Sequence, residues 1–400
     1  MQKNHFKKQL DQARKDIILQ QMDVAALDVL ACRLPQNVFM LSGYPSYLGE
    51  SLVVFPRLAE PTLMLPVDEE CFGRESWIKD VRTFMMGQDG SGAALQPILQ
   101  DLAIEKGLQK LVIGYEAILE DIACPYPTTS VPGAAICEML RTVFPDADFH
   151  DATAMLGAAQ VLKTPREIDA IRTASEIAEF GLDAARAAIG AGARESEVAG
   201  LAQNEALSKG IGHKGSSRVA AFTRCLSGNR SATAYQRLSC TGDREIRKGD
   251  LVLIELTVYV DGFWSKLART FVVGPPKPRV REMYEVCLEA QEKATAAVVD
   301  GVKAAAVERT VRDFVADRGY AESFKGILGH GIGFTPSRLA RPRFHSASDD
   351  VLQPDVVHTI ELGLFAADLG GIKIGDVVVD LGHGVEYLTQ IERSLDWAMC

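Results

Sequence analysis

The sequence has no uninterrupted apolar run near the ~18 residues that a membrane-spanning helix needs. It also has no run of basic residues, and its net charge is −10. This acidic balance argues against nucleic acid or an anionic membrane surface as the main partner. Internal repeats and low-complexity segments are absent too. What is present is 400 residues, 47% of them hydrophobic, which is enough for the cores of two or three domains.

Paired cysteines are also absent. None of the eight forms a CxxC pair, and none stands with histidine at zinc-finger spacing. Isolated cysteines in a long chain are usually reduced, which predicts a cytoplasmic protein. The lysine-rich residues 1–16 have no apolar core of a secretion signal, so residues 3–22 are expected to form a first helix.

The first 155 residues alternate between strand and helix patterns. Strands are predicted at residues 26–30, 52–55, 62–66 and 111–115, and helical material at residues 131–143. This alternation is typical of an α/β domain.

Helical signals dominate after residue 155. Thr164-Pro165-Arg166-Glu167 predicts a helix start, with a capping threonine, proline at the first position and an acid in the first turn. Further helices are expected at residues 195–209, 278–300 and 307–318. Strands are expected at residues 218–222, 251–260, 356–360, 371–374 and 377–380.

Four short segments make the second half more specific. They are the helix entry at residues 161–168, the strand pair from Gly249 to Phe271, the Gly329-His330-Gly331-Ile332-Gly333 loop and the strand at residues 355–363. In this order and spacing they resemble the prolidase, aminopeptidase P and creatinase ("pita-bread") superfamily. Residues 36–44 are similar to a strand and loop of its N-terminal domain.

The resemblance implies an α/β creatinase-type N-terminal domain at residues 1–155 and an α+β pita-bread catalytic domain at residues 156–400. It also implies a homodimer. The dinuclear metal site of the family uses two aspartates eleven residues apart, a histidine and two glutamates, which hold two divalent ions that activate water.

The matching positions depart from that ligand set. The first aspartate position is Glu255, and the second, eleven residues on, is Lys266. His330 and Glu361 keep the third and fourth ligand types, and the last glutamate position is Gly375. An ammonium at Lys266 would repel an incoming metal and offers no lone pair, so we expect no metal and no other cofactor. A slip in strand register, which would turn Lys266 to solvent, is the alternative.

Other positions are candidates for substrate contact. The resemblance puts Tyr235 where peptidases of the family carry a histidine, and Ser337 and Arg338 where they carry His-Glu. The aromatic loop containing Tyr44 and Tyr47 is bounded by glycines and could close over a ligand.

Three functions follow as hypotheses. The first, closest in character to creatinase, is a metal-independent hydrolase of a C–N bond in a small amidine, cyclic amidine (ectoine-like) or amide. Glu255 and Glu361 would be base or nucleophile, His330 would shuttle protons and Lys266 would orient the carboxylates. The second is a binding protein without turnover, and the third is a metal-dependent Xaa-Pro aminopeptidase or prolidase with a different alignment.

Overall fold

The computed structural model describes residues 11–46, 50–85, 90–108, 110–117, 133–236 and 239–400. The chain divides into two compact units, Met1–Leu162 and Lys163–Cys400, and each has its own hydrophobic core. The joint expected at residue 155 falls inside helix α6, Thr153–Val161.

The first unit is built on a mixed sheet with the strand order β4-β3-β2-β1-β5-β6. Strand β1 pairs antiparallel with β2 and parallel with β5. In chain order the elements are α1 (Gln12–Val24), β1 (Val29–Cys32), α2 (Pro35–Ser42), β2 (Leu52–Pro56), β3 (Thr62–Pro66), α3 (Glu70–Gly73), β4 (Asp80–Phe84), α4 (Gly90–Glu105), β5 (Val112–Tyr115), α5 (Gly133–Val143) and β6 (Asp148–Asp151). The predicted α/β architecture is confirmed.

The strand expected at residues 26–30 is displaced toward the C-terminus. Ala26 has a φ of 52° and belongs to the turn after α1, so extended pairing begins only at Val29. The apolar run of the sequence continues into that turn because Leu27 is buried there as well. Burial alone therefore does not mark where the strand starts.

The second unit is built on an antiparallel sheet with the order β12-β13-β9-β8-β7, and β14 pairs with β13. Its elements are α7 (Pro165–Ala188), α8 (Glu195–Gly210), β7 (Val219–Ser227), β8 (Leu251–Val260), β9 (Phe263–Val272), α9 (Pro278–Ala296), α10 (Ala304–Asp317), β10 (Gly329–His330), β11 (Arg343–Phe344), β12 (Val357–Ala366), β13 (Gly370–Asp380), β14 (Val385–Tyr387) and α11 (Leu395–Ala398). The two short strands expected at residues 371–374 and 377–380 are one continuous strand, β13.

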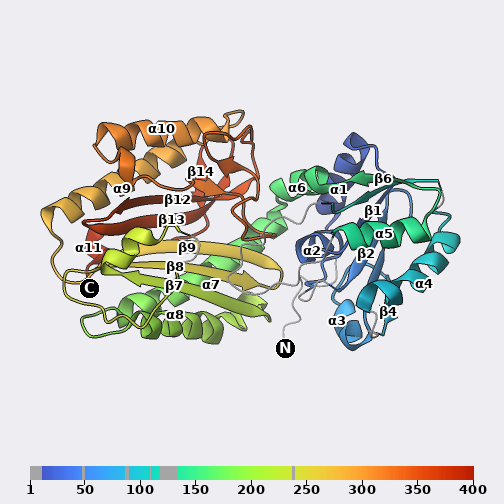
Figure 1. Cartoon of the computed structure of the whole chain (residues 1–400), viewed down its shortest axis with the longest axis horizontal. Coiled ribbons are helices and arrows are strands. Elements are labelled where there is room, and N and C mark those ends of the chain that lie inside the picture. Colours follow the sequence, from blue (N-terminus) through green and yellow to red (C-terminus); the bar gives the residue numbers. More distant parts are fainter. Residues whose placement is uncertain (1–10, 47–49, 86–89, 109, 118–132, 237–238) are drawn as a thin grey trace. The chain divides into compact units, whose positions relative to one another are not determined.

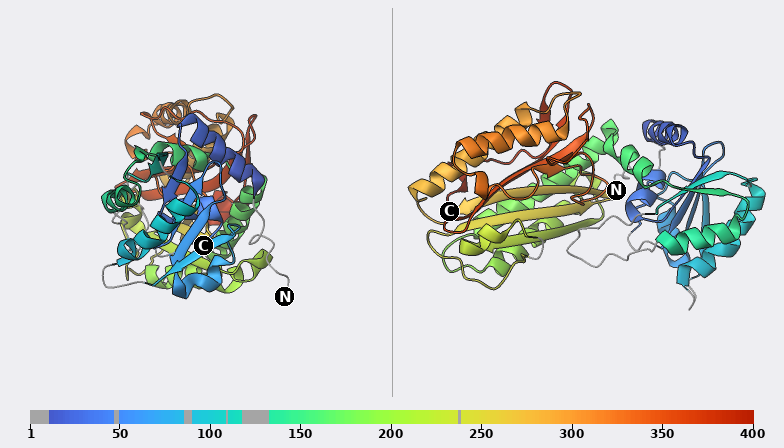
Figure 2. Two further views of the ribbon diagram at one scale, coloured as in Figure 1. Left: turned by 90° about the vertical axis from the view of Figure 1, so that its right-hand side faces the viewer. Right: turned by 45° about the horizontal axis from the view of Figure 1, so that its top comes forward.

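Helices cover one face of this sheet. Figures 1 and 2 show α7 and α8 along the β7–β9 side, and α9 with α10 along the β12–β13 side. Ser175 of α7 hydrogen-bonds Ser265 of β9, and Gln291 of α9 hydrogen-bonds Asp376 of β13. Because side chains alternate along a strand, the neighbours Lys266 and Gly375 belong to the opposite face.

Helix α7 starts where the sequence predicts. The Thr164 hydroxyl accepts a hydrogen bond from the Glu167 N–H, and the Glu167 carboxylate accepts one from the Thr164 N–H. This reciprocal capping box satisfies two backbone donors that the first helical turn leaves unpaired.

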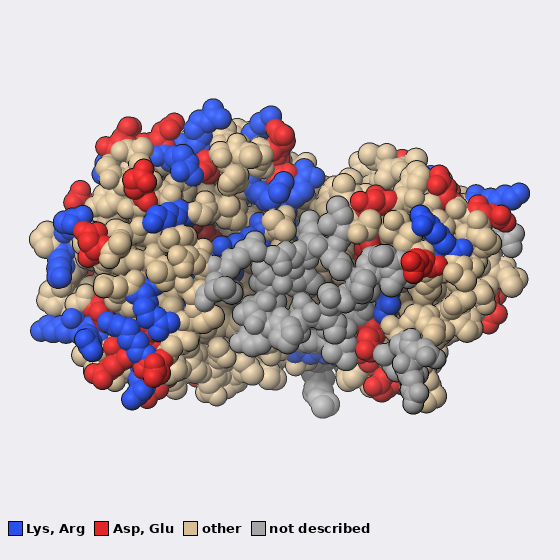
Figure 3. Space-filling view, viewed as in Figure 1, with Lys and Arg blue, Asp and Glu red and all other residues tan. Residues whose placement is uncertain are grey.

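On the face that Figure 3 shows, charges of one sign do not gather into a large patch. Lysine and arginine side chains alternate there with aspartate and glutamate side chains. Within the described part of the chain, no helix is both long and apolar enough to pass through a bilayer.

Candidate active site

Five residues, one from each main strand, form a row across the face of the second sheet that lies opposite the helices. Arg224 pairs with Glu255, Glu255 with Ala268, Ala268 with Gly375, and Gly375 with Glu361. Antiparallel register and strand alternation place all five on the same face. The row therefore runs from a cation through a carboxylate and two small residues to a second carboxylate.

The two small residues in the middle leave room for two lysines. Lys266 lies two residues before Ala268 on β9, and Lys373 lies two residues before Gly375 on β13. Since these strands run in opposite directions, the lysines stand on opposite sides of the row and share its face.

Both ammonium groups bind the carboxylates. Lys266 Nζ donates to Glu361 Oε2 at 2.8 Å. Lys373 Nζ donates to Glu255 Oε1 and to the same Glu361 Oε2, so it bridges the two acids. Arg224 donates to the other oxygen of Glu255. Lys266 thus lies in the site and not in solvent, as the unslipped register predicts.

The charges shift the pKa values of these groups. Burial alone would raise the pKa of the Glu255 carboxyl, but Lys373, Arg224 and Lys266 together hold it well below its usual range. The pKa of Glu361 is also held well below normal, against the effect of burial, by Lys266 and Lys373. Burial lowers the pKa of Lys266 to about 8, and Glu361 opposes that shift. Both carboxylates are therefore ionised at neutral pH.

His330 is placed by the glycines on either side of it. A Cβ at Gly329 would lie 2.0 Å from the Thr359 carbonyl oxygen, and a Cβ at Gly331 would lie 1.9 Å from that of Arg341. Only glycine permits such close approach of two backbones. The loop therefore lies directly against β12, and the His330 side chain is 1% exposed.

His330 and Glu361 face one another across a short gap. His330 Nδ1 lies 2.8 Å from the Gly331 carbonyl oxygen, which favours a proton on Nδ1. His330 Nε2 lies 3.2 Å from Glu361 Oε1, but neither of these buried atoms has a hydrogen-bond partner among the described residues. They are two buried acceptors without a donor.

His330 and Glu361 line a pocket. Its wall includes Tyr235, Lys325, Arg338 and Phe365 around His330 and Glu361. The rings of Tyr235 and Phe365 lie 5.5 Å apart, and the Lys325 ammonium lies 4.9 Å from the centre of the Tyr235 ring. The structure thus brings Tyr235 and Arg338, two predicted substrate-binding residues, to the same pocket as Glu361 and His330.

The other two predicted substrate contacts belong to the first unit. Tyr44 is buried, and its hydroxyl donates to Glu69. Tyr47 lies outside the described residues. A ligand contact by either residue stays a prediction.

Lys373 and Arg224 are site residues that the sequence analysis missed. Lys373 is the one lysine in the glycine-rich strand β13, and it stands two positions before the expected ligand position Gly375. That spacing could have pointed to it, since residues two apart share a strand face. No comparable signal marks Arg224, because only the β7–β8 register brings it to Glu255.

Comparison with known proteins identifies the family. Residues 169–379 match the family model of metallopeptidase family M24. The chain belongs to family M24. A Xaa-Pro dipeptidase of Pyrococcus horikoshii is 30% identical to this M24 protein over 94% of the chain and 97% of the relative. A Xaa-Pro dipeptidase of Pyrococcus furiosus is 37% identical over 59% of the chain, a match that spans 65% of the relative.

A solved structure agrees with this assignment. The prolidase from Pyrococcus horikoshii OT3 superposes with a TM-score of 0.78 at 28% identity, covering 96% of the M24 chain and 99% of the prolidase. The α/β N-terminal domain and the pita-bread catalytic domain expected from the resemblance are therefore confirmed.

The comparisons correct the predicted function. The expectation of a metal-independent, creatinase-like hydrolase of a non-peptide C–N bond is wrong. The matched family is one of metallopeptidases, and the two relatives described above are Xaa-Pro dipeptidases. The physical reason for the error is that Lys266 identified a change in the ligand set, but a change in ligands does not specify which bond is cleaved.

The described residues do not fit the metal pair that the family name implies. No group of three or more His, Cys, Asp or Glu side chains in the described ranges is arranged to hold a metal ion. Lys266 and Lys373 direct ammonium groups at Glu361, and the Gly375 position supplies no side-chain ligand. Protonated amines offer no lone pair and repel a divalent cation. We therefore assign no reaction step to a metal.

Proposed function

We propose that this M24 protein hydrolyses short peptides of the Xaa-Pro dipeptide class in the pocket over His330 and Glu361. The observation that carries the proposal is the similarity to a Xaa-Pro dipeptidase along nearly the whole of both chains. The pocket is compatible with it, because a small site with an aromatic wall and several charged groups suits a dipeptide better than a long polymer.

The side chains of the site offer the elements of a hydrolysis. Glu361 Oε1 and His330 Nε2 are acceptors that can hold a water molecule and take its proton. The ammonium groups of Lys266 and Lys373 supply positive charge that can stabilise an oxyanion as the carbonyl is attacked. Glu255 would hold Lys373 and Arg224 in place, since its carboxylate binds both.

The release of proline tests the proposal. Purified protein is incubated with Gly-Pro and Ala-Pro, as isolated, with EDTA, and with added manganese or cobalt. Free proline is measured by mass spectrometry, with Gly-Ala as the comparison substrate. Proline should be released, and Glu361→Gln should lower the rate by roughly 10²–10⁴-fold because it removes the proton acceptor. His345→Gln, at an exposed loop position, is the matched histidine control for a His330→Gln variant.

A second candidate function is peptide binding without hydrolysis. The pair of lysines on Glu361 favours it, since these ammonium groups hold the carboxylates that would otherwise be available for ligands and catalysis. Binding of Gly-Pro by calorimetry with no proline released under any metal condition would establish this candidate against the first. If no Xaa-Pro peptide is bound and no proline is released, both candidate functions are rejected.

The proposal also includes a cytoplasmic location and a homodimer, both expected from the sequence. A cytoplasmic location is supported by the described cysteines, all of which are free thiols. A homodimer is implied by the family resemblance, and light scattering coupled to size-exclusion chromatography measures it directly.

A further inference from the structure

We propose that the pocket selects a ligand whose amino end is a neutral amide N–H and whose other end is a carboxylate, such as an N-acyl dipeptide. The inference rests on the proposed function and narrows it, because the free ammonium of an ordinary dipeptide would be disfavoured. It follows from which polar atoms of the site already have hydrogen-bond partners and which do not.

The first step is the state of the four carboxylate oxygens. Both oxygens of Glu255 accept hydrogen bonds, one from Lys373 and one from Arg224. Glu361 Oε2 accepts from two lysines, Lys266 and Lys373. With the His330 proton on Nδ1, toward the Gly331 carbonyl oxygen, Glu361 Oε1 is the one oxygen of the four that has no donor within the described part of the chain.

The second step is the partner that this oxygen requires. Glu361 is 7% exposed and His330 is 1% exposed, so the free acceptors Oε1 and Nε2 are both removed from bulk water. Leaving buried acceptors unsatisfied costs about 1–3 kcal/mol each. A ligand N–H donated to Oε1 would satisfy that oxygen, whose second lone pair can still accept from the water that also donates to His330 Nε2.

The third step is the charge of that N–H group. Three cations, Arg224, Lys266 and Lys373, surround two carboxylates, which leaves one positive charge in excess. An ammonium brought to Oε1 would add a further charge to a buried, already cationic cluster, and burying an unpaired charge is strongly unfavourable. An amide N–H provides the hydrogen bond without the charge.

The fourth step is the other end of the ligand. Arg338 lines the same pocket, is half-buried, and forms no hydrogen bond or ion pair with a described residue. Lys325 stands on the same wall, beside Tyr235. A guanidinium without a protein partner is suited to bind a carboxylate through two parallel hydrogen bonds. The pocket thus provides an acceptor for an N–H and, in Arg338, a cation for a carboxylate.

Calorimetric titration in EDTA tests the inference with three probes. They are N-acetyl-Gly-Pro, Gly-Pro, and N-acetyl-Gly-Pro amide, which lacks the carboxylate. The first should bind at least about tenfold more tightly than either of the others, because only it satisfies both ends without an added charge. Equal or tighter binding of Gly-Pro would overturn the inference while leaving the proposed function standing.

Variants of Arg338 distinguish a role in binding the ligand carboxylate from a structural role. Arg338→Gln should weaken N-acetyl-Gly-Pro about tenfold and leave the weak binding of its amide unchanged, and Arg338→Lys should restore part of the loss. Arg309→Gln, at an exposed position of α10, is the matched control and should change neither. If Arg338→Gln weakens all three probes equally, or none, the assignment of the carboxylate site is wrong.

N-acetylglycine, titrated in parallel, distinguishes failure of this inference from failure of the proposed function. Binding of this non-dipeptide, with no binding or cleavage of any Xaa-Pro probe, would keep the amide–carboxylate specificity and reject the dipeptide class. No binding of any acylated probe would reject the inference.

Discussion

Gly329 and Gly331 carry His330 on a segment that nearly touches two other backbones. Their α-carbons come so close to the carbonyl oxygens of Thr359 and Arg341 that no side chain fits. The His330 N–H donates to the Thr359 hydroxyl at 3.1 Å, which ties the loop to β12. The position of the histidine against Glu361 is thus a consequence of its small neighbours.

Gly331→Ala should destabilise the second unit by about 1–3 kcal/mol, because the added methyl group forces two backbones apart. Gly200→Ala is the matched control, since this glycine lies within α8 with open space around its α-carbon. Alanine in a helix interior is better than glycine by about 0.5–1 kcal/mol, so this change should be neutral or stabilising. Denaturant unfolding measures both. A Gly331→Ala variant as stable as Gly200→Ala would contradict the steric account.

Strands β9 and β13 form the element that replaces a metal-binding surface with a cationic one. Lys266 and Lys373 reach the carboxylates from opposite sides because Ala268 and Gly375 leave the middle of the row open. A Cβ at Gly375 would lie 3.1 Å from that of Ala268 and 3.4 Å from Glu361 Cγ. A side chain at position 375 would therefore be crowded, but a small shift of the neighbouring side chains would accommodate it.

The combined variant Lys266→Asp, Lys373→Ala, Gly375→Glu should therefore acquire divalent metal. It removes both ammonium groups and supplies two carboxylates beside Glu255, His330 and Glu361. Manganese or cobalt content is measured by mass spectrometry after dialysis, and the parent protein should hold less than about a tenth of an equivalent because its lysines repel the ion. Lys303→Asp, on an exposed ion pair, controls for added negative charge. If the parent protein bound one or more equivalents of metal tightly, the conclusion that its residues do not fit a metal pair would be wrong.

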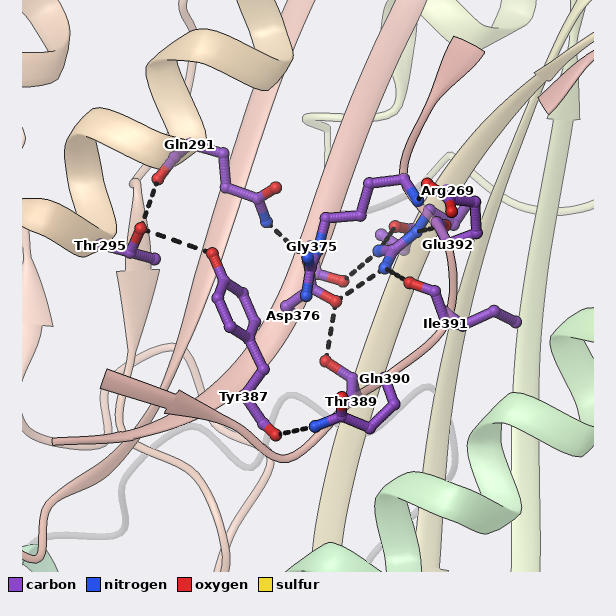
Figure 4. A network of polar contacts seen from close by, with 12 residues as sticks. Arg269, Gln291, Thr295, Gly375, Asp376, Tyr387, Thr389, Gln390, Ile391 and Glu392 are labelled. Carbon is purple, nitrogen blue, oxygen red and sulfur yellow. Dashed lines mark hydrogen bonds and ion pairs between the residues drawn. The ribbon is translucent and has the colours of Figure 1, made fainter. Parts of the chain in front are cut away.

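The second unit as a whole is held together behind the site by Asp376. Figure 4 shows this buried carboxylate among residues of β9, α9, β13 and the C-terminal segment. Arg269 Nη2 donates to it at 2.7 Å, as do Gln291 and Thr389, and the Arg269 guanidinium also binds the carbonyl oxygens of Gly375 and Ile391. Burial alone would raise the pKa of Asp376, but Arg269 and Arg393 lower it below its usual value.

This shift predicts acid sensitivity. A carboxyl whose pKa is lower in the folded state than in the unfolded state stabilises the fold above the unfolded value, near pH 4, and loses that contribution as the pH falls further. Asp376→Asn should cost about 3–5 kcal/mol at pH 7, because Arg269 is left buried without its counter-ion. The variant should also lose less stability than the parent between pH 5 and pH 3.

Urea unfolding across that pH range measures the effect. Asp169→Asn removes an exposed ion pair with Arg172 and should cost at most about 1 kcal/mol at any pH. Equal pH slopes for the parent and Asp376→Asn would contradict the role given to this carboxylate.

Much of the fold follows from local signals in the sequence. The capping box at Thr164 and the ends of strands β3 and β8 depend on neighbouring residues only, and the structure confirms them. The boundary of β1 was wrong because the turn at Ala26 is as apolar as the strand that follows it.

For the site, the sequence by itself predicted Glu255, Lys266, His330 and Glu361, because their spacing and the glycines around His330 can be read along the chain. Only the tertiary structure brought Lys373 and Arg224 to those carboxylates and left Glu361 Oε1 and His330 Nε2 without donors. Strand register across a sheet joins residues more than 100 positions apart, such as Glu255 and Lys373, and local pattern carries no information about it.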